Sequence, residues 1–216
     1  KDGTDEENND YFQQVSGGSR AIELGLITLA GTKKLGTILT IVALLIGGVI
    51  LFSTNPANVD AVLMITLIGL FLGYFYTAPP LRLVARRGLG ELTIFLTFGP
   101  LITLGTAFAI FNGDLSMAQE HLMNCLYIGI PMGLLTTNIL LINEFPDMKS
   151  DTKTNKNHLV VTFGKKASRW ICLLILGLTA YTTLMLADSV GSEKLLIPLA
   201  ILVLYGGYVF SILFKK

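Results

Sequence analysis

The sequence predicts an all-α membrane protein, a polytopic bundle of about six transmembrane helices. Of its 216 residues, 52% are hydrophobic and only 14% are charged, whereas a soluble domain is usually about one quarter charged. Apolar runs long enough to cross about 30 Å of hydrocarbon recur along the chain. These runs are continuously apolar and do not alternate, which argues against transmembrane β-strands. Composition and run length therefore define the fold class.

Six segments approach the length of a membrane-spanning helix, which is about 20 residues. They cover residues 35–52, 59–76, 89–111, 121–142, 170–187 and 195–214. Several are short, so we expect the helices to extend into the flanking residues. Kinks are expected inside three spans, at Pro100, Pro131 and Pro198. Prolines are tolerated there because neighbouring helices can satisfy the backbone groups that a proline frees.

Basic residues predict the orientation in the membrane. Fifteen of the sixteen Lys and Arg flank the spans on one side, and only Lys194 lies in an opposite loop. By the positive-inside rule, both termini and the two long loops are cytoplasmic. The formal net charge of +1 gives no indication of a nucleic-acid partner. We expect a multi-pass integral membrane protein that does not bind nucleic acid.

The chain opens in a polar stretch, KDGTDEENNDYFQQVSGGSR, with neither an initiating Met nor a signal peptide. Such a start is typical of the interior of a loop. We therefore expect these residues to be part of a longer protein.

The segment after the fourth span, NEFPDMKSDTKTNKNHLVVTFGKK, carries the clearest chemical signal. Asn143, Asp147 and Asp151 follow at four-residue spacing, which places them near one face of a helix leaving the membrane. Mg²⁺ prefers a few carboxylates together with water and phosphate oxygens, and Lys153 and Lys156 can meet the remaining phosphate charge. Most such acidic pairs are solvated helix surface, but charge beside hydrocarbon is costly. The placement therefore favours a metal and diphosphate site.

Two other loops contain candidate anion ligands. In the opening loop, a Gly-Gly pair precedes Arg20, which can bind phosphate in a bidentate manner; a flexible surface loop is an equally good interpretation. The loop after the second span carries three arginines, Arg82, Arg86 and Arg87. Ordinary topology determinants would look the same. Two histidines are weaker candidates for a general base, because His121 is expected on the opposite side of the membrane and only His158 lies near the Asp motif.

Together, these segments resemble the UbiA superfamily of intramembrane aromatic prenyltransferases. The resemblance rests on GGSRAIELGLI, YTAPPLRLVARRGLGEL and NEFPDMKSDTKTNKNHLVVTFGKK, which occur in the family's order. The most similar branch is the one around 1,4-dihydroxy-2-naphthoate prenyltransferase, which makes the menaquinone precursor. The resemblance implies a single UbiA-type domain over residues 1–216, incomplete at the N-terminus and also at the C-terminus. The complete fold is a bundle of nine transmembrane helices around one cavity.

The resemblance also implies a set of site residues. The family's first Asp motif reads NDxxD, of which only the tail is present, with Asp5 as the best match to its last Asp. Its second motif is complete, with the catalytic residues Asn143, Asp147 and Asp151. The implied ligands of Mg²⁺ are Asp5, Asp147 and Asp151. The implied ligands of the diphosphate are Arg20, Lys156, Arg82 and Lys153.

The implied activity is Mg²⁺-dependent transfer of a polyprenyl group from an allylic diphosphate to an aromatic acceptor, 1,4-dihydroxy-2-naphthoate, within the bilayer of a prokaryotic cell membrane. Other acceptors stay open, namely 4-hydroxybenzoate, homogentisate, a chlorophyllide or a glyceryl phosphate lipid. A membrane transporter would place ionisable groups near the bilayer midplane, where these spans have almost none. A structural subunit has no need of spaced Asp and Lys residues. The oligomeric state is not indicated.

Overall fold

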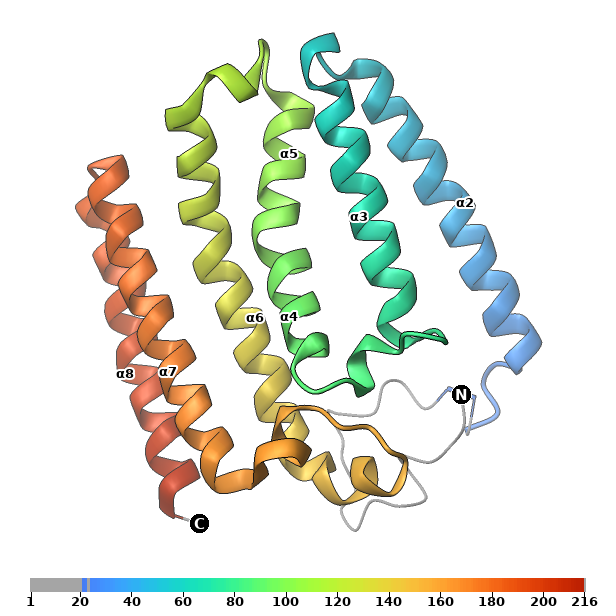
Figure 1. The fold of residues 1–216 in the computed structure, drawn as a ribbon, viewed down its shortest axis with the longest axis vertical. Coiled ribbons are helices and arrows are strands. Elements are labelled where there is room, and N and C mark those ends of the chain that lie inside the picture. The colour runs from blue at the N-terminus through green and yellow to red at the C-terminus, as the bar shows by residue number, and fades with distance from the viewer. Residues whose placement is uncertain (1–20, 23, 216) are drawn as a thin grey trace.

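The computed structural model describes residues 21, 22 and 24–215, which form a helical bundle (Figure 1). No β-strand occurs in this part of the chain, and six helices are long and apolar enough to cross a membrane. They are Leu29–Ser53, Pro56–Thr77, Leu89–Ile110, Gln119–Lys153, Leu159–Val190 and Glu193–Ile212. The all-α class and the six spans are therefore confirmed. Asp5 and Arg20 lie outside the described residues, and their roles stay predictions.

The helices follow one another across the bundle in chain order, with α4 and α5 end to end (Figure 1). Their bounds are α2 Leu29–Ser53, α3 Val59–Thr77, α4 Leu89–Leu96, α5 Ile102–Ile110, α6 Gln119–Lys153, α7 Leu159–Val190 and α8 Leu196–Lys215. Helices α6 and α7 contact each other along much of their length, and α8 packs on α7. This arrangement places the ends of α3, α4, α6 and α7 close together at one end of the bundle.

Several helices extend beyond the apolar runs that predict them. Helix α2 begins at residue 29 because Thr28 caps it, its Oγ1 accepting a hydrogen bond from Gly31 N–H at 3.0 Å. Helix α6 runs unbroken through Pro131 and Pro146 to Lys153. It therefore projects past the span and carries the Asp motif on a regular helix.

The third span is one apolar run but not one regular helix. A π-helical turn, Thr97–Leu101, separates α4 from α5, and Gly99 has non-helical angles of φ −114° and ψ −106°. The expected kink at Pro100 is therefore present. Gly99 lies so close to α6 that an added Cβ would come within 2.6 Å of the Gly129 carbonyl oxygen. Small residues allow the two backbones to touch here, as in other tightly packed membrane helices.

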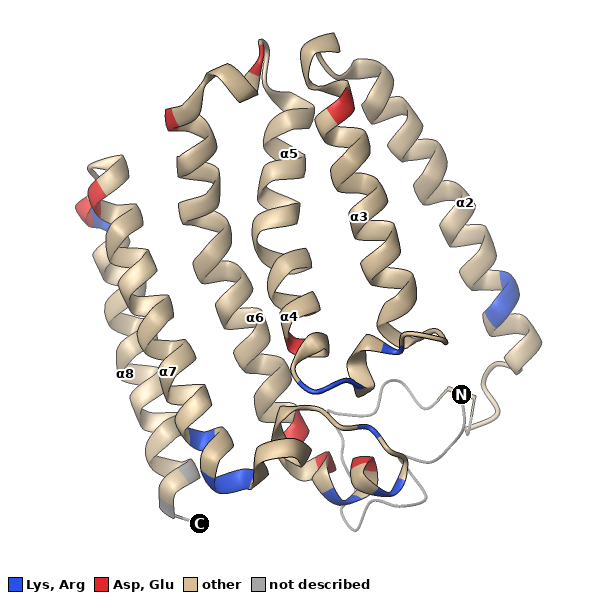
Figure 2. Cartoon of the chain, in the orientation of Figure 1, with Lys and Arg blue, Asp and Glu red and all other residues tan. Residues whose placement is uncertain are grey.

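Charged residues are unequally distributed between the two ends (Figure 2). Lys and Arg gather at the end where the α3–α4 and α6–α7 loops lie. At the other end, the short loops are joined by the fully buried Asn58. Its Nδ2 donates to the carbonyls of Phe111 and Gly113 at 3.2 and 2.9 Å, and its Oδ1 accepts from Leu115 N–H at 3.0 Å. Basic residues are therefore concentrated at one end, while the loops at the other end are held together by the contacts of Asn58.

Candidate functional site

The projecting end of α6 carries the Asp motif. Asn143 is exposed, Asp147 is half-buried and Asp151 is buried, with 1% of its surface exposed. Four residues advance a helix by about 40° beyond one full turn, so side chains at this spacing spiral from solvent toward the core. The three residues form a stripe along the helix, and its last member points inward.

Both carboxylate oxygens of Asp151 have cationic partners. Lys156 Nζ donates to Oδ1 at 3.2 Å, and His158 Nε2 lies 2.9 Å from Oδ2. The chain reverses between these residues, with Asn155 in the left-handed region at φ 55° and Lys156 N–H bonded to the Asp151 carbonyl at 2.9 Å. The structure therefore brings together one predicted metal ligand and one predicted diphosphate ligand. Lys153 lies nearby, exposed, in the last turn of α6.

His158 lies between two carboxylates at the start of α7. Its Nδ1 is 3.0 Å from Glu144 Oε2 and its Nε2 is 2.9 Å from Asp151 Oδ2, and all three residues are buried. Burial lowers the pKa of His158, but the hydrogen bonds to Asp151 and Glu144 outweigh this and raise the pKa to about 9. Its Nε2 donates to Asp151 Oδ2, whereas its Nδ1 lies at ion-pair distance from Glu144 Oε2 and 3.4 Å from the Val161 N–H in the first turn of α7.

Glu91, in the first turn of α4, is the third buried carboxylate. Its Oε1 accepts the Leu159 N–H at 2.7 Å, and so supplies a partner for a backbone donor in the first turn of α7. Its Oε2 is buried without a hydrogen-bond partner among the described residues. Side-chain ligand atoms of Glu91, Glu144 and His158 all lie within 4.8 Å of one another. This buried cluster joins α4, α6 and α7 at their meeting point.

Three buried carboxylates, those of Glu91, Glu144 and Asp151, lie close together at this end of the bundle. Among the described residues, Lys156 lies at ion-pair distance from Asp151, and His158 from both Asp151 and Glu144. Together with half-buried Asp147, these carboxylates offer a set of hard oxygen donors at this end of the bundle. Such a donor set fits Mg²⁺ better than a softer metal.

A basic cleft of about 530 Å³ lies beside the cluster, between the α3–α4 and α6–α7 loops. It is lined by Pro80, Arg82, Ala85, Arg86, Arg87, Leu89, Asn155 and Asn157. Arg86 braces its own loop, because its Nε donates to the Leu81 carbonyl at 2.9 Å. Arg82 adopts left-handed angles with φ 43° and is exposed. The cleft offers several donors to an anion, but its lining includes neither Asp147 nor Asp151.

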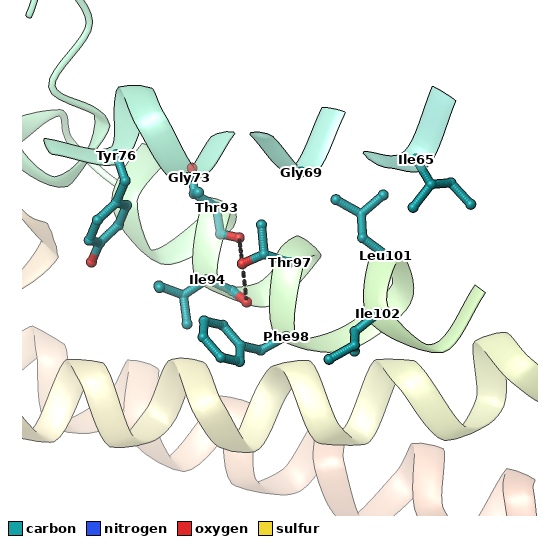
Figure 3. A pocket seen from close by; sticks show the side chains of 10 residues that line it. All are labelled: Ile65, Gly69, Gly73, Tyr76, Thr93, Ile94, Thr97, Phe98, Leu101 and Ile102. Atoms are coloured by element: carbon teal, nitrogen blue, oxygen red, sulfur yellow. Dashed lines mark hydrogen bonds between the residues drawn. The ribbon is translucent and has the colours of Figure 1, made fainter. Parts of the chain in front are cut away.

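An apolar cavity of about 400 Å³ runs between α3 and the broken helix α4–α5 (Figure 3). Tyr76 lies at one end and Ile65 toward the other, and Gly69 and Gly73 lie between them. Thr93 Oγ1 donates to the Leu89 carbonyl at 2.7 Å, so its hydroxyl is satisfied by its own helix. Tyr76 lies near the C-terminal end of α3 and Thr93 in the first half of α4, so this part of the cavity is at the end of the bundle where the buried cluster joins α4, α6 and α7.

Sequence reasoning did not assign Glu91 or Glu144 to the site. Glu144 stands inside the NEFPD segment, but the four-residue spacing drew attention to its neighbours. Glu91 opens an apolar span, where a charge is costly without a partner, and this was the available signal. The predicted proximity of His158 to the motif is correct.

The fold and the site together define a class of protein. It is an all-helical membrane protein with acidic and basic residues clustered at one end of its bundle, beside an apolar cavity. Residues 13–216 match the UbiA prenyltransferase family. The chain belongs to this family, and the resemblance found in its motifs is confirmed.

Curated relatives include enzymes of naphthoquinone synthesis. The chain is 30% identical to 2-carboxy-1,4-naphthoquinone phytyltransferase of Arabidopsis thaliana over 79% of this chain and 47% of that protein. It is 30% identical to the phytyltransferase of the same name from Synechocystis sp., over 77% and 52%. Its identity to 1,4-dihydroxy-2-naphthoate octaprenyltransferase of Escherichia coli is 26%, over 78% and 56%. The chain thus spans about half the length of these relatives. No solved structure matches it at a significant level.

Proposed function

We propose that this protein transfers a polyprenyl group from an allylic diphosphate to an aromatic acceptor in a Mg²⁺-dependent reaction. The proposed acceptor is 1,4-dihydroxy-2-naphthoate, in menaquinone biosynthesis. This acceptor is supported by relatives from a plant, a cyanobacterium and a bacterium whose names all refer to carboxylated naphthalene rings. The proposed location is a prokaryotic cell membrane, with the site on the cytoplasmic side because the basic loops lie at that end.

One observation carries this proposal: α6 places Asp147 and Asp151 at the end of a membrane span, with Lys156 3.2 Å from Asp151. Carboxylates for a divalent cation and an ammonium group for phosphate therefore lie together beside apolar helices. We assign metal binding to Asp147 and Asp151, and to Asp5 from outside the described residues. We assign a supporting polar role to Asn143.

Diphosphate binding is assigned to cations around this stripe. Lys156 would donate to phosphate oxygens beside Asp151. Arg82 would contribute from the α3–α4 loop and Lys153 from the last turn of α6, with Arg20 from outside the described residues. Bound Mg²⁺ would neutralise the charge that develops on the leaving diphosphate, without proton transfer. Each donor is most effective in a site from which water is excluded.

The apolar cavity between α3 and α4–α5 suits the isoprenoid part of the donor. Its lining is almost entirely hydrocarbon, and Tyr76, near the C-terminal end of α3, lies at one end of it (Figure 3). The two glycines on α3 leave room for a chain along that helix. Enclosure by apolar walls would also keep an allylic carbocation away from water. The same slot would then align the reactive carbon with the acceptor ring.

A product assay tests this function. Purified protein in lipid, given an allylic polyprenyl diphosphate and Mg²⁺, should prenylate 1,4-dihydroxy-2-naphthoate, and EDTA should abolish the reaction. Parallel assays with 4-hydroxybenzoate, homogentisate, a chlorophyllide and a glyceryl phosphate lipid should give much less product. Preferential use of one of these acceptors would contradict the naphthoate assignment, and no transfer to any acceptor would contradict prenyl transfer itself.

A further inference from the structure

Asp151 is supported from inside the protein by His158. The two side chains are each 99% buried, and His158 Nε2 lies 2.9 Å from Asp151 Oδ2. A carboxylate oxygen has no hydrogen to give, so Nε2–H must be the donor. The Lys156 side chain is 24% exposed, whereas that of His158 is 1% exposed. His158 is therefore the more firmly placed partner of this carboxylate.

Binding to His158 leaves Asp151 able to accept further partners. An ionised carboxylate offers about four lone-pair positions, and the hydrogen bonds from His158 and Lys156 occupy two of them. Carboxylates that bind metal ions are themselves commonly hydrogen-bonded from behind, and this fixes their orientation. His158 is placed to hold the Asp151 carboxylate in this way, through a hydrogen bond to Oδ2.

His158 is in turn fixed by two other helices. Its Nδ1 lies 3.0 Å from Glu144 Oε2 on α6. The residue after it, Leu159, donates its N–H to Glu91 on α4 at 2.7 Å. The imidazole therefore cannot shift along α7 without breaking contacts to both neighbouring helices.

We propose that His158 is a positioning residue that orients Asp151 for binding of a divalent cation, and that Glu144 and Glu91 fix His158 in this role. This inference rests on the proposed function, because it assumes that Asp151 binds the cation. It assigns His158 no contact with the substrates. Its consequence is that loss of His158 weakens cation binding and leaves the acceptor site unchanged.

His158 is also the N-cap of α7, because its Nδ1 lies 3.4 Å from the Val161 N–H. The variant His158→Asn separates the positioning role from this capping role. Asn is a favoured N-cap residue, so α7 should still begin at Leu159, but its shorter side chain does not reach Asp151. We expect Mn²⁺ affinity, measured by EPR titration of the purified protein in lipid nanodiscs, to fall about 10- to 100-fold, as is usual when a group supporting a metal ligand is lost. The Mg²⁺ concentration for half-maximal activity should rise in parallel, while the KM for the acceptor stays unchanged.

Two further variants complete the test. His158→Gln has an amide that can still donate to Asp151, and it should recover most of the Mn²⁺ affinity. His121→Asn, at the opposite end of the bundle, should match the wild type. Wild-type Mn²⁺ affinity in His158→Asn, or equal losses in His158→Asn and His158→Gln, would overturn the positioning role. A wild-type protein that binds no Mn²⁺ would instead refute the proposed metal site itself.

Discussion

At the scale of single residues, the site depends on buried carboxylates that are only partly paired inside the protein. Asp151, Glu144 and Glu91 are almost fully buried, and a buried charge is tolerated only when it is paired and hydrogen-bonded. His158 lies at ion-pair distance from two of these carboxylates, and the Leu159 N–H donates to Oε1 of the third, whose Oε2 has no hydrogen-bond partner among the described residues. Polar chemistry can therefore lie directly beside the apolar cavity without unfolding the helix ends around it.

Gly73 provides a residue-scale test of the isoprenoid slot. A Cβ added there meets nothing within 4 Å, so Gly73→Leu should fill the cavity without displacing packed atoms. The leucine side chain would then compete with the isoprenoid chain for the same space. Overfilling an apolar space typically costs about 1–3 kcal/mol, so transfer from a long polyprenyl diphosphate should fall about tenfold or more. Transfer from a short donor should be less affected.

Gly48→Leu on α2 is the matched control, since a Cβ there also meets nothing within 4 Å and no residue of α2 lines this cavity. Rates for geranyl and octaprenyl diphosphate should be compared in both variants. Equal rates for wild type and Gly73→Leu with the long donor would show that the chain lies elsewhere.

At the scale of secondary-structure elements, α6 is the helix that organises the site. It contacts α4, α5 and α7, and it continues for about three turns beyond the apolar run that ends at residue 142, so that it presents the Asp motif. Its close approach to α4 and to the π turn depends on Gly129 and Gly133. The position of Glu144 relative to Glu91 therefore depends on contact between backbones in the middle of the bundle.

Gly133→Ala tests this dependence. The added Cβ would overlap the Phe95 carbonyl oxygen, so α4 and α6 must separate. We expect a stability loss of about 1–3 kcal/mol, typical of overpacking, seen as a lower midpoint of thermal unfolding in detergent. Gly177→Ala on α7, where a Cβ meets nothing within 4 Å, should leave the midpoint unchanged or slightly raised. Equal midpoints for the two variants would show that the contact is not tight.

At the scale of the whole molecule, the bundle separates a charged end from an apolar interior. Basic loops, acidic stripe and buried cluster lie at one end (Figure 2), and the cavity leads away from it between α3 and α4. A substrate with a charged head and a hydrocarbon tail fits this division. Insertion in the bilayer is therefore part of how such a site would work.

The sequence predicted the parts of this account that depend on local pattern. Hydropathy alone located all six spans, and the Asp motif was placed correctly on a helix leaving the membrane. Helix ends were less accurate, because caps such as Thr28 and the continuation of α6 through Pro146 carry little hydropathy signal. The break at Gly99 was anticipated only as a proline kink.

The buried cluster could not be predicted in the same way. Glu91 and Leu159 are 68 positions apart in sequence, and only the packing of α4 against α6 and α7 brings them together. Nor does four-residue spacing show which carboxylate faces inward, because that depends on which side of α6 the other helices cover. Asp151 is enclosed and Asn143 exposed for this reason alone.

The central claim is that Asp147 and Asp151 bind the cation required for prenyl transfer. The most direct test is the prenyl transfer rate at saturating Mg²⁺ in Asp147→Ala and Asp151→Ala, with Asp188→Ala at the opposite end of the bundle as control. Loss of a group that stabilises charge in a transition state commonly costs about 10²- to 10³-fold in rate, so both site variants should lose at least that much and the control nothing. Wild-type rates in a correctly inserted Asp147→Ala or Asp151→Ala protein would contradict the account.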